Sequence, residues 1–228
     1  GSGMDFDGPT ADDFGNVASL NRAWLTLLRQ DPASRKAAGR DAEPHMADIA
    51  NLTHRESERL AESPFLLFSF RERDEALWSG IIEGTRRRHL FRDTRSREAE
   101  TILASALGFI WQLARQNPYA LRLICGATLY WSERIGELTF YRLLSAVRQT
   151  DRIPVLRSAG HPTLWRKLLT TGISASDDIR SAAQLCALQA VLTEPAASQR
   201  PERFAMAASR SRAPGLWVAE DNERHSRS

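Results

Sequence analysis

The chain has 228 residues, of which 42% are hydrophobic and 26% are charged, fractions that exclude collagen-like, mucin-like and wholly disordered proteins. Its longest apolar stretches, Phe65–Phe68 and Ala106–Trp111, are far shorter than the roughly 18 to 20 residues that a membrane-spanning helix needs. Because 31 basic residues oppose 28 acidic ones, the net charge of +3 does not by itself indicate a nucleic-acid ligand.

Residues 1–15 show no helical period. Gly1-Ser2-Gly3 before Met4 is typical of an expression tag, and the acidic residues after Met4 do not follow the basic and then apolar order of a secretory leader. We therefore expect tag sequence and loose chain in this segment. The same features favour a cytoplasmic protein.

A helix is predicted next, because apolar residues recur at intervals of three and four on one face. These residues are Val17, Leu20, Trp24, Leu27 and Leu28. Asp31 and Pro32 end this helix, and the proline suits the first turn of a second, alanine-rich helix. A further helix opens at Thr53, because Thr53 and Glu56 match a capping box, and it is expected to reach about Ser63.

The segment 65–71 differs from its helical neighbours. It is short, rich in phenylalanine and preceded by Pro64, features that favour a strand or an extended edge segment. Another helix is predicted to open at Asp74 or Glu75 and to be closed by Gly84.

The chain after Gly84 is strongly basic. Six arginines occur before position 98, and they are Arg86, Arg87, Arg88, Arg92, Arg95 and Arg97. We interpret residues 85–97 as a basic linker between a helical domain at 16–84 and a helical bundle domain at 98–194. Such a cluster can neutralise DNA phosphates and release their counterions, or it can be ordinary solvated surface.

The second region is also predicted to be helical. One helix occupies residues 96–116, and Asn117 with Pro118 begins the next. That helix is expected to extend to about Val147, with a bend or break near Gly136.

A turn over residues 151–162 is predicted to lead into a short helix that ends at Gly172. Ser176 then offers an N-cap for the last helix, whose first turn holds two acids. The predicted apolar face of that helix consists of Ile179, Ala183, Cys186 and Val191. Residues 195–228 lack any period and are interpreted as a disordered tail. The predicted fold class is therefore mainly α, a helical bundle with a short extended segment near 65–71.

No catalytic or metal-binding motif is recognisable in the sequence. The five histidines lack ligand spacing, and Cys125 and Cys186 have no paired cysteine or nearby histidine. Both cysteines are predicted to be buried thiols. We expect no catalytic residue, no metal and no cofactor.

Aromatic side chains are concentrated between Tyr119 and Tyr141 and recur at a few other positions. At helical spacing they supply either a core or a protein interface. The candidates for contact with a protein partner are Trp24, Phe65, Phe70, Tyr130, Trp131 and Trp217. Trp217 is included because an isolated apolar residue in a loose tail can dock on a partner.

Five short motifs follow one another over about residues 18–75. They are Leu20-Asn21-Arg22-Ala23-Trp24-Leu25, Asp31-Pro32-Ala33-Ser34, Ala50-Asn51-Leu52-Thr53, Leu60-Ala61-Glu62-Ser63, and Leu66 with Phe70-Arg71. In this order and at these spacings they resemble the FlhD family of bacterial flagellar transcriptional regulators. The resemblance does not extend to residues 97–194, and the chain lacks the cysteine-rich zinc motif of FlhC, the partner of that family.

The resemblance implies a mainly helical protein that dimerises and works with FlhC, which carries much of the DNA contact. We therefore expect a non-catalytic regulatory protein in transcription control, with an FlhC-like regulator or a larger complex as its protein partner. DNA and a second copy of the chain are further candidate partners. On this hypothesis the six arginines touch phosphates, while the N-terminal unit is held together by Trp24, Leu28, Leu60 and Phe70.

An accessory or assembly subunit is the alternative. Such a protein would bind an enzyme or another large complex through its aromatic helices and its tail, without touching DNA. The small net charge and the lack of a clear helix-turn-helix favour this interpretation.

Overall fold

The computed structural model describes two stretches of the chain, residues 8–85 and 95–194. Three segments lie outside the described residues: 1–7, 86–94 and 195–228, the last being the segment expected to form a disordered tail. Helices make up 71% of the described residues, which confirms the mainly α fold class. No helix within them is long and apolar enough to cross a membrane.

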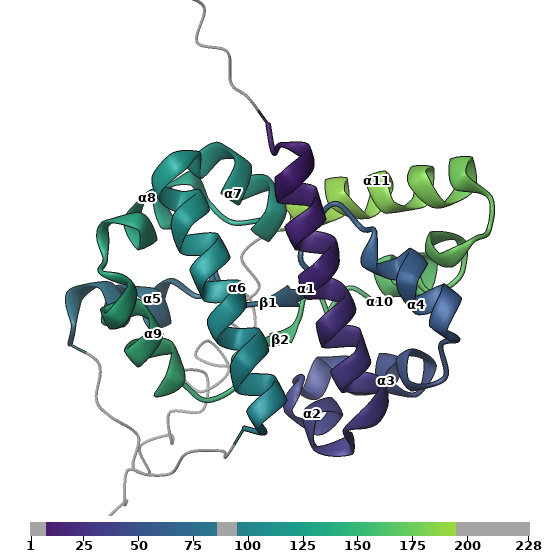
Figure 1. Ribbon diagram of the computed structural model, residues 1–228, viewed down its shortest axis with the longest axis horizontal. Helices are drawn as coiled ribbons and strands as arrows, with labels where there is room; N and C mark the ends of the chain where they lie inside the picture. The colour runs from purple at the N-terminus through teal and green to yellow at the C-terminus, as the bar shows by residue number, and fades with distance from the viewer. Residues whose placement is uncertain (1–7, 86–94, 195–228) are drawn as a thin grey trace, which may run out of the picture. The chain divides into compact units, whose positions relative to one another are not determined.

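The stretch 8–85 contains five α-helices, a short 3-10 helix and one strand (Figure 1). They are α1 (Ala11–Gln30), α2 (Pro32–Ala37), η1 (Arg40–Ala42), α3 (Glu43–Ala50), α4 (His54–Ala61), β1 (Phe68–Ser69) and α5 (Glu75–Glu83). The predicted ends at Thr53 and Gly84 are confirmed: Thr53 forms a capping box with Glu56, and Gly84 ends α5 in the left-handed conformation. The strand β1 confirms the extended segment near 65–71.

The first helix begins earlier than predicted. We expected loose chain up to residue 15, but α1 starts at Ala11. The Thr10 hydroxyl accepts a hydrogen bond from the Asp13 amide at 3.1 Å, and the Asp13 carboxylate accepts one from the Thr10 amide at 2.9 Å. This capping box satisfies two amide donors that a helix start otherwise leaves without partners.

The stretch 95–194 contains a second set of elements. They are α6 (Arg97–Gln116), α7 (Pro118–Cys125), α8 (Leu129–Glu137), α9 (Phe140–Arg148), β2 (Val155–Leu156), α10 (Pro162–Leu168), η2 (Thr171–Ile173) and α11 (Asp177–Thr193). The run predicted as one helix over 118–147 with a bend or break near Gly136 forms three helices: the predicted break is confirmed at Leu138–Thr139, whereas the break after Cys125 was not predicted. Gly126 in the left-handed conformation ends α7, and Thr128 and Thr139 each cap a new helix.

The last helix has the predicted start but a different buried face. Ile179 and Cys186, which were expected to be buried, are exposed on α11. The residues that α11 buries are Gln184, Ala187 and Val191. The Gln184 amide sets this face, because it donates to the carbonyls of Arg59 at 2.9 Å and Gly172 at 3.0 Å.

The two sets of elements repeat one arrangement. Helices α1 and α6 both have 20 residues, and they are followed by equivalent cap-and-proline pairs, Asp31–Pro32 and Asn117–Pro118, which lie 86 positions apart. Thr53 and Thr139, also 86 positions apart, cap α4 and α9. Two α-helices lie between these caps in both sets, α2 and α3 in the first and α7 and α8 in the second, and the first set has the short η1 in addition.

The repeat continues beyond the strands. In each set, a tryptophan of the following helix donates its indole N–H to the backbone carbonyl eight residues earlier. Trp78 donates to the Phe70 carbonyl at 3.0 Å, and Trp165 donates to the Arg157 carbonyl at 2.8 Å. The two tryptophans are 87 positions apart. The sequence analysis did not detect this duplication, because few residue identities are shared between the copies.

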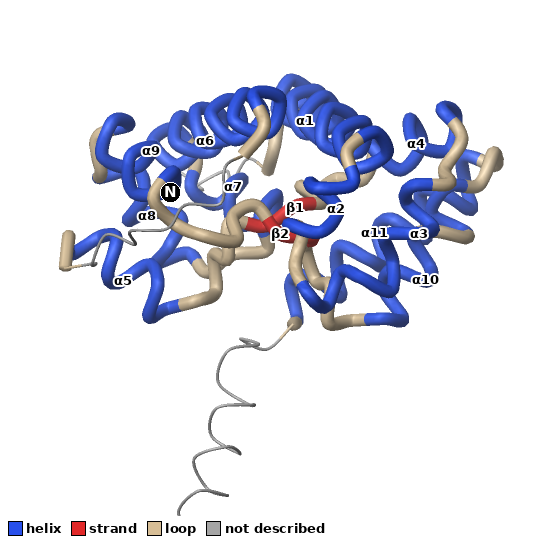
Figure 2. Tube along the Cα trace, turned by 90° about the horizontal axis from the view of Figure 1, so that it is seen from below, coloured by secondary structure: helices blue, strands red, loops and turns tan. Residues whose placement is uncertain are grey.

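The two copies, residues 10–84 (the first half) and 96–173 (the second half), pair about an approximate twofold axis. Strand β1 is antiparallel to β2, with Phe68 opposite Leu156. Helices α1 and α6 lie side by side and run in opposite directions (Figure 1, Figure 2). The last helix of each half packs on the other half, α5 on α8 and α10 beside α3. Helix α11 follows the second half and has no counterpart among residues 8–85.

The described halves belong to one compact unit, so the basic linker 85–97 does not separate two domains as expected. One hydrophobic core includes buried residues from both halves. Backbone hydrogen bonds also join them: the Leu66 amide donates to the Ile124 carbonyl at 3.0 Å, and the Arg157 amide to the Leu67 carbonyl at 2.8 Å. A single half is too small to bury much apolar surface alone, and pairing removes that limit.

Replacement of Asn21 by alanine tests the packing of the first half. The fully buried Asn21 amide donates to the carbonyls of Ala61 at 3.2 Å and Phe65 at 2.9 Å, and it accepts from the Leu67 amide at 2.8 Å. Since each unsatisfied buried group costs about 1–3 kcal/mol, we expect Asn21→Ala to lower the free energy of unfolding by at least about 3 kcal/mol in urea titrations. The exposed Asn51→Ala is the control, and equal denaturation midpoints for the two variants would contradict this role.

Candidate functional site

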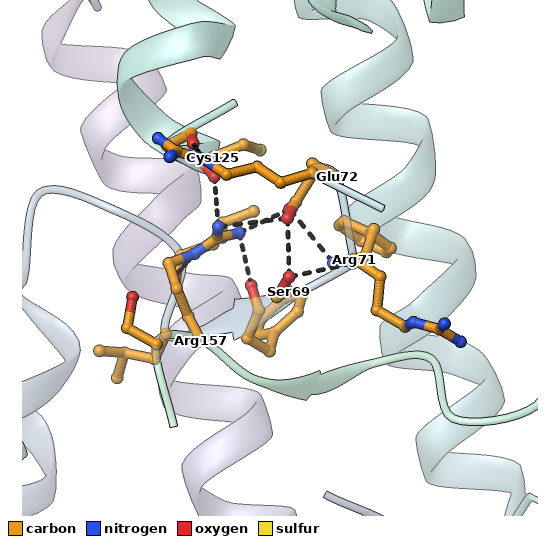
Figure 3. A network of polar contacts seen from close by, with 12 residues as sticks. Ser69, Arg71, Glu72, Cys125 and Arg157 are labelled. Atoms are coloured by element: carbon orange, nitrogen blue, oxygen red, sulfur yellow. Dashed lines mark hydrogen bonds and ion pairs between the residues drawn. The ribbon is translucent and has the colours of Figure 1, made fainter. Parts of the chain in front are cut away.

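The most deeply buried charges of the described residues lie where the two halves meet (Figure 3). Arg157 follows β2 and Glu72 follows β1, and their side chains are 6% and 2% exposed. The Arg157 Nη2 atom lies 2.6 Å from the Glu72 Oε1 atom. Antiparallel pairing of the two strands brings these residues together although they are 85 positions apart.

All five N–H groups of the Arg157 guanidinium have acceptors. Nε donates to the Leu66 carbonyl at 2.6 Å, and Nη2 donates to the Phe68 carbonyl at 2.8 Å as well as to Glu72. Nη1 donates to the Cys125 carbonyl and to Glu72 Oε2 at 3.3 Å. A buried arginine is tolerated only when its charge and its donors are satisfied in this way.

Glu72 is held equally firmly on its own side of the sheet. Its carboxylate accepts from the Ser69 hydroxyl at 2.7 Å and from the Phe70 amide at 3.1 Å. The Ser69 hydroxyl in turn accepts from the Arg71 amide at 2.9 Å. These bonds order the turn that follows β1, as Figure 3 shows.

The electrostatic environment of this cluster keeps Arg157 charged and the Cys125 thiol protonated. Burial is the strongest single influence and lowers the pKa of Arg157, but the charge and hydrogen bond of Glu72, together with smaller contributions from Cys125 and Glu194, raise that pKa above its ordinary value. Burial also raises the pKa of the Cys125 thiol, and the Glu72 charge adds to that rise. A closed ion pair and a protonated thiol offer no nucleophile or base to a substrate, so the cluster joins the halves rather than performing chemistry.

The sequence analysis did not single out Arg157 or Glu72. Each lies in a segment with other charged residues, and no local pattern marks either one as buried. The duplication supplies the missing signal, since it predicts that the segments after β1 and β2 lie close to the twofold axis.

The arginines predicted to contact DNA have different environments. Four of them lie outside the described residues: Arg86, Arg87, Arg88 and Arg92. Arg97 is exposed at the first position of α6, where a phosphate could reach it.

The predicted phosphate contact of Arg95 is wrong. Its side chain is 14% exposed and donates to the carbonyls of Thr150 at 2.8 Å and Ile153 at 2.9 Å. It also donates to the Arg148 carbonyl at 3.2 Å and contacts Glu100 at 3.4 Å. Arg95 therefore satisfies backbone acceptors between α9 and β2 and is unavailable to a phosphate.

Most described residues predicted to contact a protein partner lie in the core instead. Trp24, Phe65, Phe70 and Trp131 are buried, because both halves use their aromatic side chains to fill the space between helices. Trp217 lies outside the described residues. Tyr130, which is 66% exposed on α8, is the remaining candidate. The helical spacing of aromatic residues could not by itself distinguish a core residue from a residue that contacts a partner.

The cysteines also differ from the expectation of two buried thiols. Cys125 is buried beside Arg157, whereas Cys186 is exposed on α11. Within residues 8–85 and 95–194, no three His, Cys, Asp or Glu side chains are grouped so that they could hold a metal ion.

Comparisons with protein-family models, curated proteins and solved structures found no match to this chain. Function is therefore inferred from its own residues.

Neutralisation of Glu72 tests the ion pair between the halves. Glu72→Gln keeps the shape of the side chain but leaves the buried Arg157 charge without a counterion, so we expect the free energy of unfolding to fall by about 3–5 kcal/mol. The control is Glu58→Gln, which removes the exposed partner of Arg22 and is expected to cost at most about 1 kcal/mol. Urea titration of both variants measures the difference, and similar losses would contradict the assigned role.

Thiol labelling tests the burial of the two cysteines. In the native protein we expect a thiol reagent such as Ellman's reagent to modify Cys186 rapidly and Cys125 only on unfolding, because Cys125 is buried and its pKa is raised. The Cys186→Ser variant should then show no fast reaction. Rapid modification of that variant under native conditions would contradict the packing around Arg157.

Proposed function

We propose that the protein is a non-catalytic regulatory protein that acts through contacts with a second protein and with DNA. The observation that supports this best is the pairing of two similar halves about an approximate twofold axis. Regulators that bind DNA commonly pair two copies of one unit, so that equivalent contacts are made at two places. Here one chain supplies both copies, and the first copy contains the motifs that resemble FlhD.

Exposed apolar side chains support contact with a protein partner. On α8 and α9, Tyr130 and Tyr141 are 66% and 81% exposed, and on α11 Ile179 and Leu185 are 51% and 57% exposed. Exposed aromatic and aliphatic side chains of this size are available for contact with a partner. An accessory subunit would use the same side chains, so the two hypotheses differ in whether DNA is also bound.

An uneven distribution of charge supports contact with DNA. Residues 8–85 contain 13 acidic and nine basic side chains, whereas residues 95–194 contain 12 basic and eight acidic ones. In the sequence, the segment 86–94 directly precedes the basic half and contains four arginines and one acid. Positive charge attracts phosphates, so the basic half is the better candidate for contact with DNA.

Removal of three arginines tests the DNA contact while leaving the structural Arg95 in place. We expect a triple alanine variant to bind a random-sequence duplex more weakly and to lose up to about 2.7 units from the slope of log K against log salt concentration, at about 0.9 per lost phosphate contact. The residues replaced are Arg86, Arg87 and Arg88.

A second triple alanine variant is the matched control, because it removes the same charge from exposed positions of the first half. Its residues are Lys36, Arg40 and Arg55. Fluorescence anisotropy at several salt concentrations measures both variants. Equal slopes for the two variants would contradict the phosphate role, and absence of DNA binding by the unaltered protein would favour an accessory subunit.

A further inference from the structure

A cleft of about 490 Å³ opens between α3 of the first half and α10 of the second. Its apolar lining includes Leu52, Leu169 and Ile173, and its polar lining includes His45, Asp48 and Arg166. This volume falls within the range of about 300–1,000 Å³ that small-molecule sites occupy. Because the two walls come from different halves, the cleft exists only in the paired structure.

His45 is the unusual residue of this cleft. Its side chain lines the cleft, the residue is only 8% exposed, and its ring lies against Trp165 with 6.0 Å between ring centroids. Within the part of the chain that the structure describes, the imidazole makes no hydrogen bond or ion pair. Buried polar groups are nearly always hydrogen-bonded, so a nitrogen that faces the cleft has capacity for a ligand.

The twofold repeat provides a comparison within the same chain. Trp131 stands 86 positions after His45, and Trp78 stands 87 positions before Trp165. Trp131 and Trp78 are thus the counterparts of His45 and Trp165. Their two indoles pack edge to face, with 5.3 Å between centroids, and Trp131 is buried. The indole of Trp131 is larger than the imidazole that His45 places at the equivalent position.

On the side of Trp131 and Trp78, here called the closed side, the nearby charged groups have partners, although the Trp131 Nε1 and Arg134 Nε atoms are buried without a hydrogen-bond partner among the described residues. Arg134, the counterpart of Asp48, forms an ion pair with Glu137 at 2.8 Å. Arg142 donates to the Ile82 carbonyl at 2.7 Å and so connects α9 to the end of α5. The closed side therefore leaves no matching set of unpaired charges.

The open side keeps its charges unpaired. Asp48 on α3 and Arg166 on α10 are exposed and form no hydrogen bond or ion pair through their side chains within the described residues. A third charge of the lining, Glu56, already accepts a hydrogen bond from the Thr53 amide at 3.2 Å. One free anion and one free cation thus stand on opposite walls above an apolar lining.

We propose that this cleft binds a free α-amino acid with an apolar or aromatic side chain. The guanidinium of Arg166 binds the carboxylate, because charge-assisted bonds to a planar carboxylate suit arginine. Asp48 accepts from the ammonium group, and His45 supplies the buried hydrogen-bonding group. The ligand side chain packs on Leu52 and Leu169. This binding site is independent of the proposed regulatory function and would let a metabolite stabilise the paired halves.

Isothermal titration calorimetry of the full chain with L-phenylalanine, L-leucine and L-tryptophan tests the proposal. We expect saturable binding of at least one of them and a melting temperature that rises with its concentration. For L-phenylalanine the matched probes are 3-phenylpropanoate, which lacks the ammonium, and 2-phenylethylamine, which lacks the carboxylate. Each should bind at least about tenfold more weakly than the amino acid, as expected for loss of a charge-assisted bond. No binding of any amino acid, or equal binding of the analogues, would overturn the proposal.

Two variants each replace a cleft residue by the residue at the equivalent position of the closed side, which is Trp131 for His45 and Ser79 for Arg166. His45→Trp should abolish amino-acid binding by filling the cleft, and Arg166→Ser should weaken it at least about tenfold. Lys167→Ser is the matched control, because Lys167 is the next residue of α10, is exposed and does not line the cleft. If His45→Trp does not fold, the comparison of Arg166→Ser with Lys167→Ser still decides, and equal affinities would overturn the proposal.

Discussion

The ion pair between Arg157 and Glu72 is the interaction on which the paired structure depends. Strands β1 and β2 have two residues each, so their own ladder contributes few hydrogen bonds. Arg157 supplies further bonds to the first half, at the carbonyls of Leu66 before β1 and Phe68 within it, and one bond in its own half, to the Cys125 carbonyl at the end of α7. The free-energy cost of removing the Arg157 guanidinium from water is offset only while every one of these acceptors is in place. The contacts that join the halves therefore form and break together.

Because the fold is duplicated, equivalent positions occur on both sides of the twofold axis, and their surroundings differ. On one side of the axis Trp131 and Trp78 pack together, and the local charges pair with one another. On the other side His45 takes the place of the indole, and a cleft with unpaired charges remains. The unpaired groups of the open side are available to a ligand. The proposed regulatory function and the proposed ligand site use different surfaces of this arrangement.

Local signals predicted much of the secondary structure because capping is a short-range effect. The capping box at Thr53, the cap and proline at Asn117–Pro118 and the left-handed Gly84 each involve residues within one helical turn. The helix break at residues 126–128 was missed, since apolar spacing continues through it, whereas the break predicted near Gly136 occurs at residues 138–139. The candidate site was predicted only in part. Arg97 is exposed as expected, but Arg95 and the core aromatics have structural roles.

The sequence by itself determined the mainly helical fold class, most helix ends and the extended segment near residue 68, because propensity, caps and prolines act over a few residues. Only the tertiary structure decided that the two halves pair, that Arg157 meets Glu72 85 positions away, and that His45 faces an open cleft. These outcomes depend on which distant segments come into contact. The same arginine or aromatic residue is exposed or buried according to those contacts, and its neighbours in the sequence do not specify them.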